Sequence, residues 1–291
     1  MRARVVIHQD DVGMCNGANT AFVELARSGA ITSGSVMVPC PWFSEIAEVA
    51  AADPQLDLGV HLTLTAEKAH YRWRPITGAP PSAGLTDASG YMWRDVASVR
   101  RHADPTAAEA ELRAQVDTAL AAGIDVTHLD AHMGTALAPE FCETYLRLGV
   151  DYRLPIVLTG TLAGYGPSNH LHDVTEDRYA QFVARARVLG QPIFDEVRET
   201  PWDRPATRTL FDDVPDGLTF FALHPNAPGE LEAIEPDTAH IRIAEYELLC
   251  GADVAAWLGP DVDRIGMRQL RDELRASSSE DSAPSVAPES A

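Results

Sequence analysis

The strongest constraint on how this chain folds is a regular alternation of short apolar runs with segments of helical periodicity. The apolar runs predict strands at residues 4–8, 33–39, 57–64, 125–131, 151–158 and 217–225. The helical patterns cover residues 16–29, 42–53, 104–123, 138–149, 176–190, 238–251 and 267–276. This alternation predicts a mainly parallel sheet with helices outside it, either closed into a barrel or open and doubly wound.

Charged and imidazole side chains gather around the ends of these apolar runs. They are Asp10, Asp11, His61, His128, Asp130, His132, Arg153 and His224. The carboxyl ends of parallel strands lie at one edge of a sheet, where α/β active sites form. In a barrel these ends converge on one centre, whereas in an open sheet they diverge. A site shared by several strands therefore favours the barrel.

Asp10 and Asp11 are adjacent carboxylates at the end of an apolar run, where they repel each other and lose hydration, so they indicate a nearby cation. One Asp with two neutral imidazoles would leave coordination positions open, as in a catalytic metal site. Such a set suits zinc, and also Mg, Mn, Ni or Co. Each residue also has a structural interpretation. His61 or His128 could be a core histidine, and Asp130 could cap a strand or orient a ligand histidine.

Three segments interrupt the alternation. Residues 66–103 look like a long insertion after the third strand, and its Trp73 and Trp93 could stack on sugars or pack the segment itself. Residues 160–175 look like a mobile loop, in which His170 and His172 have no assigned role. Residues 277–291 contain almost no apolar side chains and are expected to be a disordered acidic tail. Residues 1–276 are expected to form one domain.

The composition excludes several partners. The net charge of −20 argues against nucleic acid and anionic membranes, whose phosphates need a basic face. No apolar run approaches a membrane span, and the start of the chain shows no secretory signal. The four cysteines are scattered, which favours reduced thiols in a cytoplasmic protein. A homodimer remains open.

Five motifs carry a resemblance to a known family. The opening "DDVGMCNGANTAFVELARSGAITSGSVMVPCPWF", then "LGVHLTLT", "THLDAHMG", "YRLP" and "HP", resembles the YdjC-like (ChbG/HpnK) carbohydrate deacetylases, which are similar to NodB-type polysaccharide deacetylases. The resemblance implies a (β/α) barrel variant, TIM-like but irregular or seven-stranded. It also implies a small-molecule carbohydrate substrate, one divalent metal ion (Mg or Zn foremost) and removal of an acetyl group from an amino sugar.

The resemblance also implies individual roles. Asp11, His61 and His132 would hold the metal, Asp10 would be the base, Arg153 its partner, and His224 the acid. The chain departs from chitooligosaccharide-type members after "DAH", where Met133 follows in place of a histidine and changes the substrate side of the site.

Three other interpretations stay open. The chain could be another metal-dependent barrel hydrolase or isomerase that acts on a non-acetylated substrate. It could also be a non-catalytic sugar-binding homologue, although binding alone requires neither a base nor an acid. The acidic surface could instead belong to an interaction scaffold.

Overall fold

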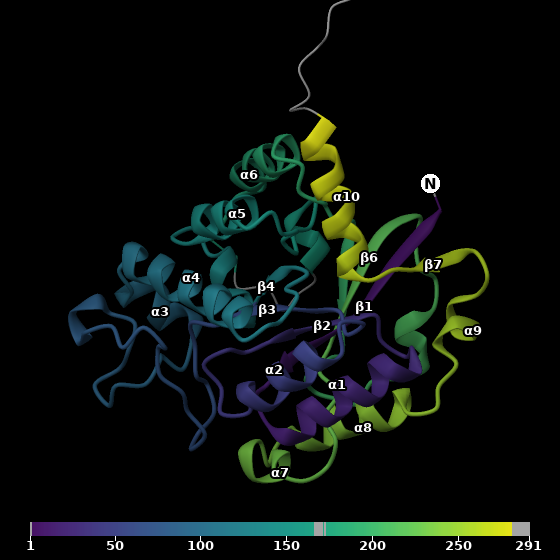
Figure 1. The fold of residues 1–291 in the computed structure, drawn as a ribbon, viewed down its shortest axis with the longest axis horizontal. Coiled ribbons are helices and arrows are strands. Elements are labelled where there is room, and N and C mark those ends of the chain that lie inside the picture. Colours follow the sequence, from purple (N-terminus) through teal and green to yellow (C-terminus); the bar gives the residue numbers. More distant parts are fainter. Residues whose placement is uncertain (1, 166–170, 172, 281–291) are drawn as a thin grey trace, which may run out of the picture.

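The computed structural model describes residues 2–165, 171 and 173–280, and its centre is a sheet of parallel strands (Figure 1). Six strands follow the order β4-β3-β2-β1-β6-β5, and β7 pairs with the first residues of β1. The strands are β1 (Ala3–Val12), β2 (Ser33–Val36), β3 (Leu58–Leu62), β4 (Leu129–Ala131), β5 (Glu196–Glu199), β6 (Gly217–Leu223) and β7 (Val262–Arg264). The predicted parallel α/β architecture is therefore confirmed, although β5 was not anticipated.

The sheet curls into a half-barrel. Leu129 of β4 forms an isolated bridge with Ile156, and Thr159 forms one with Phe194, just before β5. The edge strands β4 and β5 are thus connected through residues 156–159 by single bridges. The strand expected at residues 151–158 is thus reduced to single bridges. The regular strands do not establish a complete TIM barrel.

Helices surround the strands, as the alternation predicted. The longer ones are α1 (Asn16–Ser28), α2 (Phe43–Ala52), α4 (Pro105–Ala121), α5 (Cys142–Asp151), α6 (Glu176–Val188), α8 (Ala239–Leu249) and α10 (Met267–Glu280). Shorter ones are α3 (Val96–His102), α7 (Leu231–Ile234) and α9 (Val254–Leu258), with 3₁₀ turns at Pro81–Ala83, His132–Leu137, Leu162–Tyr165 and Arg208–Phe211. In Figure 1, α1, α2 and α8 lie together on one side of the strands, and α3 to α6 lie on the other. No helix within the described part of the chain has the length and apolarity to cross a membrane.

Local signals fix where these helices begin and end. Asp104 accepts hydrogen bonds from the backbone N–H groups of Thr106 and Ala107, and Pro105 occupies the first turn of α4, where its missing N–H costs nothing. Helix α1 ends at Gly29, whose φ of 75° is the left-handed conformation that glycine adopts readily. These are the boundaries that the sequence predicted.

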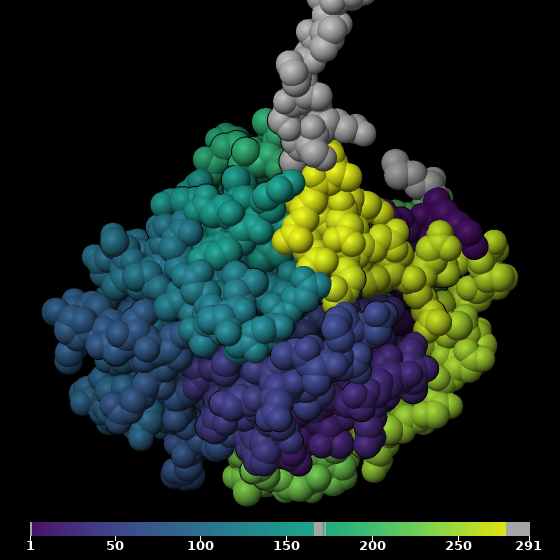
Figure 2. All heavy atoms as spheres, viewed as in Figure 1, coloured from purple at the N-terminus to yellow at the C-terminus, as the bar shows by residue number. Residues whose placement is uncertain are grey.

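Helix α10 covers the amino-terminal end of the strands, opposite the polar strand ends. Met267 and Leu270 pack in one buried cluster with Val6 and Phe220, and Arg268 donates a hydrogen bond to the carbonyl of Leu56, just before β3. Figure 2 shows α10 in yellow, seated between the N-terminal and middle parts of the chain. The helix continues to Glu280, four residues into the segment expected to be disordered, and residues 281–291 lie outside the described part.

Residues 66–103, expected to be an insertion, form the connection from β3 to α4 and contain α3. Trp73 is 3% exposed and donates a hydrogen bond from Nε1 to the carbonyl of Thr65. Trp93 stacks on the ring of His102, with ring centroids 4.5 Å apart. Both tryptophans therefore pack the segment against its own neighbours.

Candidate functional site

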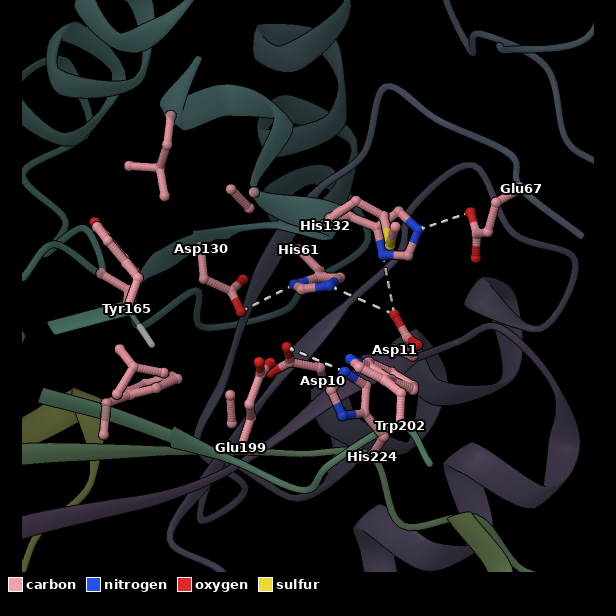
Figure 3. A pocket seen from close by; sticks show the side chains of 18 of the residues that line it. Asp10, Asp11, His61, Glu67, Asp130, His132, Tyr165, Glu199, Trp202 and His224 are labelled. Carbon is pink, nitrogen blue, oxygen red and sulfur yellow. Dashed lines mark hydrogen bonds and ion pairs between the residues drawn. The ribbon is translucent and has the colours of Figure 1, made fainter. Parts of the chain in front are cut away.

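A pocket of about 460 Å³ opens at the carboxyl ends of the strands (Figure 3). Its polar lining comes from several elements: Asp10, Asp11, His61, Glu67, Lys68, Asp130, His132, Glu199, His224, Glu235 and Arg242. The volume lies in the range typical of small-molecule sites. Seven of the eight polar strand-end residues named from the sequence thus belong to one region, six of them as pocket lining and His128 behind it.

A bulge at the end of β1 explains how two consecutive aspartates serve one pocket. Neighbouring side chains on a regular strand point to opposite faces. Here the pairing of β1 with β2 shifts its register between Gln9 and Val12, and Asp11 takes a φ of 59°. The local turn aims both Asp10 and Asp11 at the pocket, as bulges near active sites commonly do.

Asp11, His61 and His132 bring three potential metal donors together. Oδ1 of Asp11 lies 3.4 Å from Nε2 of His61 and 3.1 Å from Nδ1 of His132. All three residues are buried, and their donor atoms lie within 4.8 Å of one another. This Oδ1 accepts no hydrogen bond of good geometry from the described residues, which leaves it able to bind a cation.

A carboxylate holds the far nitrogen of each histidine. Nδ1 of His61 lies 2.9 Å from Oδ2 of Asp130, and Nε2 of His132 lies 3.1 Å from Oε2 of Glu67. In metal sites this arrangement fixes the tautomer, because the proton sits on the nitrogen that faces the carboxylate and the other nitrogen keeps its lone pair. The residues present therefore fit a divalent metal. Asp130 has the orienting position that the sequence allowed for it, whereas Glu67 was not anticipated.

Arg242 sets the charge of Asp11. Its Nη1 lies 2.7 Å from Oδ2 of Asp11, and both side chains are buried. Burial alone would raise the pKa of Asp11, but Arg242, His132 and His61 together hold it well below its usual range. Arg242 was not among the residues expected at the site, because a single arginine within the amphipathic pattern of α8 resembles a surface residue.

Asp10 lies between two histidines. Its Oδ1 is 2.8 Å from Nδ1 of His8, and its Oδ2 is 3.6 Å from Nε2 of His224. Nε2 of His8 in turn lies 2.9 Å from Nε2 of His128, which is fully buried. His8 therefore orients one oxygen of Asp10 and leaves the other directed toward His224.

Burial shapes the protonation of two of these histidines. Burial lowers the pKa of His224 to about 4, against the opposing charge of Asp10. Burial and the neighbouring His8 lower the pKa of His128 to about 3. Both imidazoles are thus neutral near pH 7 in the described state.

The position of Arg153 does not fit the role expected for it. Its Nη2 donates a hydrogen bond to the carbonyl of Arg275 in α10, and it does not line the pocket. Arg153 precedes the segment that pairs with β4 at Ile156. It therefore lies at the amino-terminal end of the strands, whereas the pocket lies at their carboxyl ends. His8 and Arg242 provide the contacts to the two aspartates.

Of the three residues expected to contact the substrate, one lines the pocket and two do not. Met133 lines the pocket, is 37% exposed and has a φ of 53°. Trp73 and Trp93 do not line it. Trp202, which was not expected from the sequence, lines the pocket, and its ring centroid lies 4.7 Å from that of His224. His170 and His172 lie outside the described residues.

Comparisons with known proteins identify a family and several similar proteins. The family described as "YdjC-like protein" matches residues 4–259. A carbohydrate deacetylase of Thermus thermophilus is 32% identical over 94% of this chain and 96% of its own length. One from Listeria monocytogenes is 26% identical over 92% of this chain and 100% of its own length. A crystal structure of a candidate cellobiose-phosphate cleavage protein from Enterococcus faecalis shares the fold, with a TM-score of 0.76, 20% identity, and coverage of 93% of this chain and 99% of that one.

Proposed function

Because the chain belongs to the YdjC-like protein family, we propose that it is a metal-dependent hydrolase that removes the acetyl group from an N-acetylated amino sugar or related carbohydrate. The observation that carries this proposal is the cluster of Asp11, His61 and His132, in which each histidine is oriented by a carboxylate. A binding protein would need neither this cluster nor the acid–base pair beside it.

Asp11, His61 and His132 would hold one divalent metal ion, with Zn and Mg foremost. When bound, the ion supplies Lewis acidity, which polarises the acyl carbonyl and makes water more acidic. Arg242 keeps Asp11 ionised for this purpose. Asp130 and Glu67 keep the imidazole lone pairs directed inward.

Asp10 acts as the general base. His8 holds Oδ1 of Asp10 at 2.8 Å, so Oδ2 remains to accept a proton from the attacking water. The water oxygen adds to the acyl carbon while its proton passes to Asp10. His8 takes the positioning role that the resemblance assigned to Arg153.

His224 acts as the general acid toward the leaving amine. A histidine whose pKa is lowered to about 4 does not carry a proton in advance at pH 7. We therefore infer that Asp10, whose Oδ2 lies 3.6 Å away, passes on the proton that it received from water. His224 then delivers that proton to the amine nitrogen as the C–N bond breaks.

The test is release of acetate from N-acetylglucosamine and its oligomers by protein reconstituted with Zn or Mg. His132→Ala should lower the bound metal and abolish release. His128→Ala is the matched control, because His128 lies behind the site and should leave metal content intact. Metal loss at His128→Ala with metal retained at His132→Ala would overturn the assignment. Metal binding without acetate release from any N-acetylated sugar would overturn the function.

A further inference from the structure

The interior beneath the catalytic residues has one polar and one apolar side. On β6, Phe220, Ala222 and His224 share a face because side chains alternate along a strand, so the first two lie deeper than His224. On β1, the same alternation places His8 beneath Asp10. His8 pairs in register with Ala222, so the two sides meet at this level.

The polar side is built of hydrogen-bonded side chains, although Oδ1 of Asp130 has no hydrogen-bond partner among the described residues. His8 contacts His128 and Asp10, and Ser35 donates a hydrogen bond to Asp130 at 2.8 Å. The apolar side lines the pocket with four residues that we call the apolar recess: Val157, Val197, Phe220 and Ala222. Phe220 pairs in register with Val197, and all four pack within one hydrophobic cluster.

The proposed acid gives the substrate a direction. An amide has an amine end and an acyl end, and His224 must face the amine nitrogen. Trp202 lies against His224 at 4.7 Å between ring centroids, so the sugar belongs on that side. Figure 3 shows Trp202 and His224 together, with Tyr165 on the opposite side and Asp10, His61 and Asp130 between them.

The recess does not suit a sugar ring. Hydroxyl groups buried against Val157, Val197 and Phe220 would lose their hydrogen bonds to water, at a cost that apolar walls do not offset. The phenol oxygen of Tyr165 on that side accepts hydrogen bonds from the Thr159 backbone N–H and from the Tyr179 hydroxyl. A hydrocarbon chain is the group that gains free energy there.

We infer that the apolar recess receives the acyl chain of the substrate, so that the site accepts N-acyl groups longer than acetyl. This inference rests on the proposed function, because it uses the direction that His224 imposes on the amide. It extends the substrate class from N-acetyl amino sugars to those with longer acyl chains, such as N-butyryl and N-hexanoyl groups.

The first experiment compares N-acetyl-, N-butyryl- and N-hexanoylglucosamine with the metal-loaded protein. Each buried methylene should raise kcat/KM roughly fourfold until the recess is full. Cleavage of the acetyl compound with progressive loss for the longer chains would overturn the inference while leaving the proposed function intact.

A series of binding measurements tests the inference without catalytic turnover. The carboxylates acetate, butyrate and hexanoate should bind the metal-loaded protein with Kd values that fall roughly fourfold per methylene, measured by calorimetry. Equal Kd values would overturn the inference. If no N-acyl sugar is cleaved, the proposed function fails, and the carboxylate series still decides the recess.

Ala222→Leu tests the location. The added side chain fills the recess, so the ratio of kcat/KM for butyryl over acetyl substrate should fall at least fourfold. Ala110→Leu, at an exposed position of α4, is the matched control and should leave that ratio unchanged. An unchanged ratio in Ala222→Leu, with the protein folded, would place the acyl chain elsewhere.

Discussion

At the scale of single residues, the bulge of β1 gives two identical side chains different surroundings. Asp11 is 2% exposed and faces Arg242 and two histidines, whereas Asp10 is half-buried and faces His8 and His224. Coordination and proton transfer require such a division, because a carboxylate that binds the metal is no longer available as a base.

Asparagine at each position separates the two roles. Asp10→Asn should retain metal while turnover falls by roughly 10² to 10⁴, the usual loss for a general base, and added metal should not restore it. Asp11→Asn should lose metal affinity, because an anionic ligand is gone and the buried Arg242 loses one of its two carboxylate partners, the other being Glu235. Metal analysis with and without supplementation measures both. A swap of these outcomes would exchange the assignments, and equal, metal-rescuable losses would make both residues ligands.

At the scale of elements, the connection from β3 to α4 is held in place by its own aromatic side chains. Trp73 is buried beside Tyr71, and Arg72 bonds to Asp87 within the same connection at 2.7 Å. The connection supplies Glu67 and Lys68 to the pocket, so its packing places a carboxylate against His132.

Tryptophan substitutions distinguish packing from substrate contact. Trp73→Ala should lower the free energy of unfolding by roughly 3–5 kcal/mol, because it leaves a large cavity in the core. Trp202→Ala should leave that free energy nearly unchanged and raise KM instead, since Trp202 is 41% exposed at the pocket. Urea unfolding and steady-state kinetics measure the pair. A raised KM with unchanged stability in Trp73→Ala would show that this residue meets the substrate.

At the scale of the whole molecule, α8 ties the outer helices to the catalytic edge of the sheet. It supplies Arg242 to Asp11 and Glu245 to the segment after β6, where the Glu245 carboxylate accepts hydrogen bonds from the His224 backbone N–H and the Thr200 hydroxyl. Burial, only partly offset by these hydrogen bonds, raises the pKa of Glu245 to about 7.

This raised pKa predicts a pH dependence of stability. Folded Glu245 binds its proton more tightly than the unfolded residue does, so its contribution is complete below about pH 4.5 and is lost as pH rises through about 7. Glu245→Gln keeps the size and removes the titration. Relative to that variant, the wild-type free energy of unfolding should decline between about pH 4.5 and 7, by on the order of 1.4 kcal/mol for each pH unit, and level off at higher pH. A constant difference across this range would show that Glu245 ionises as it does in water.

The sequence by itself determined which residues end the strands, because an apolar run and the polar residue that follows it are adjacent in the chain. The parallel α/β architecture, the caps of α4 and the grouping of Asp10, Asp11, His61, His132 and His224 follow from that local information. The same local information gave the wrong position for Arg153. This residue lies near the start of an apolar run, whereas the other residues lie near the ends of theirs.

Only the tertiary structure decided which other side chains contact and orient these site residues. Arg242 is 231 residues from Asp11, and Glu67 is 65 residues from His132, so nothing in the local pattern links them. The bulge that turns Asp11 toward the pocket, the burial of Trp73 and the curl that leaves a half-barrel also depend on packing. These features share one physical reason. Each depends on which surfaces come into contact when the helices pack against the sheet, and those contacts join parts of the chain that are distant in sequence.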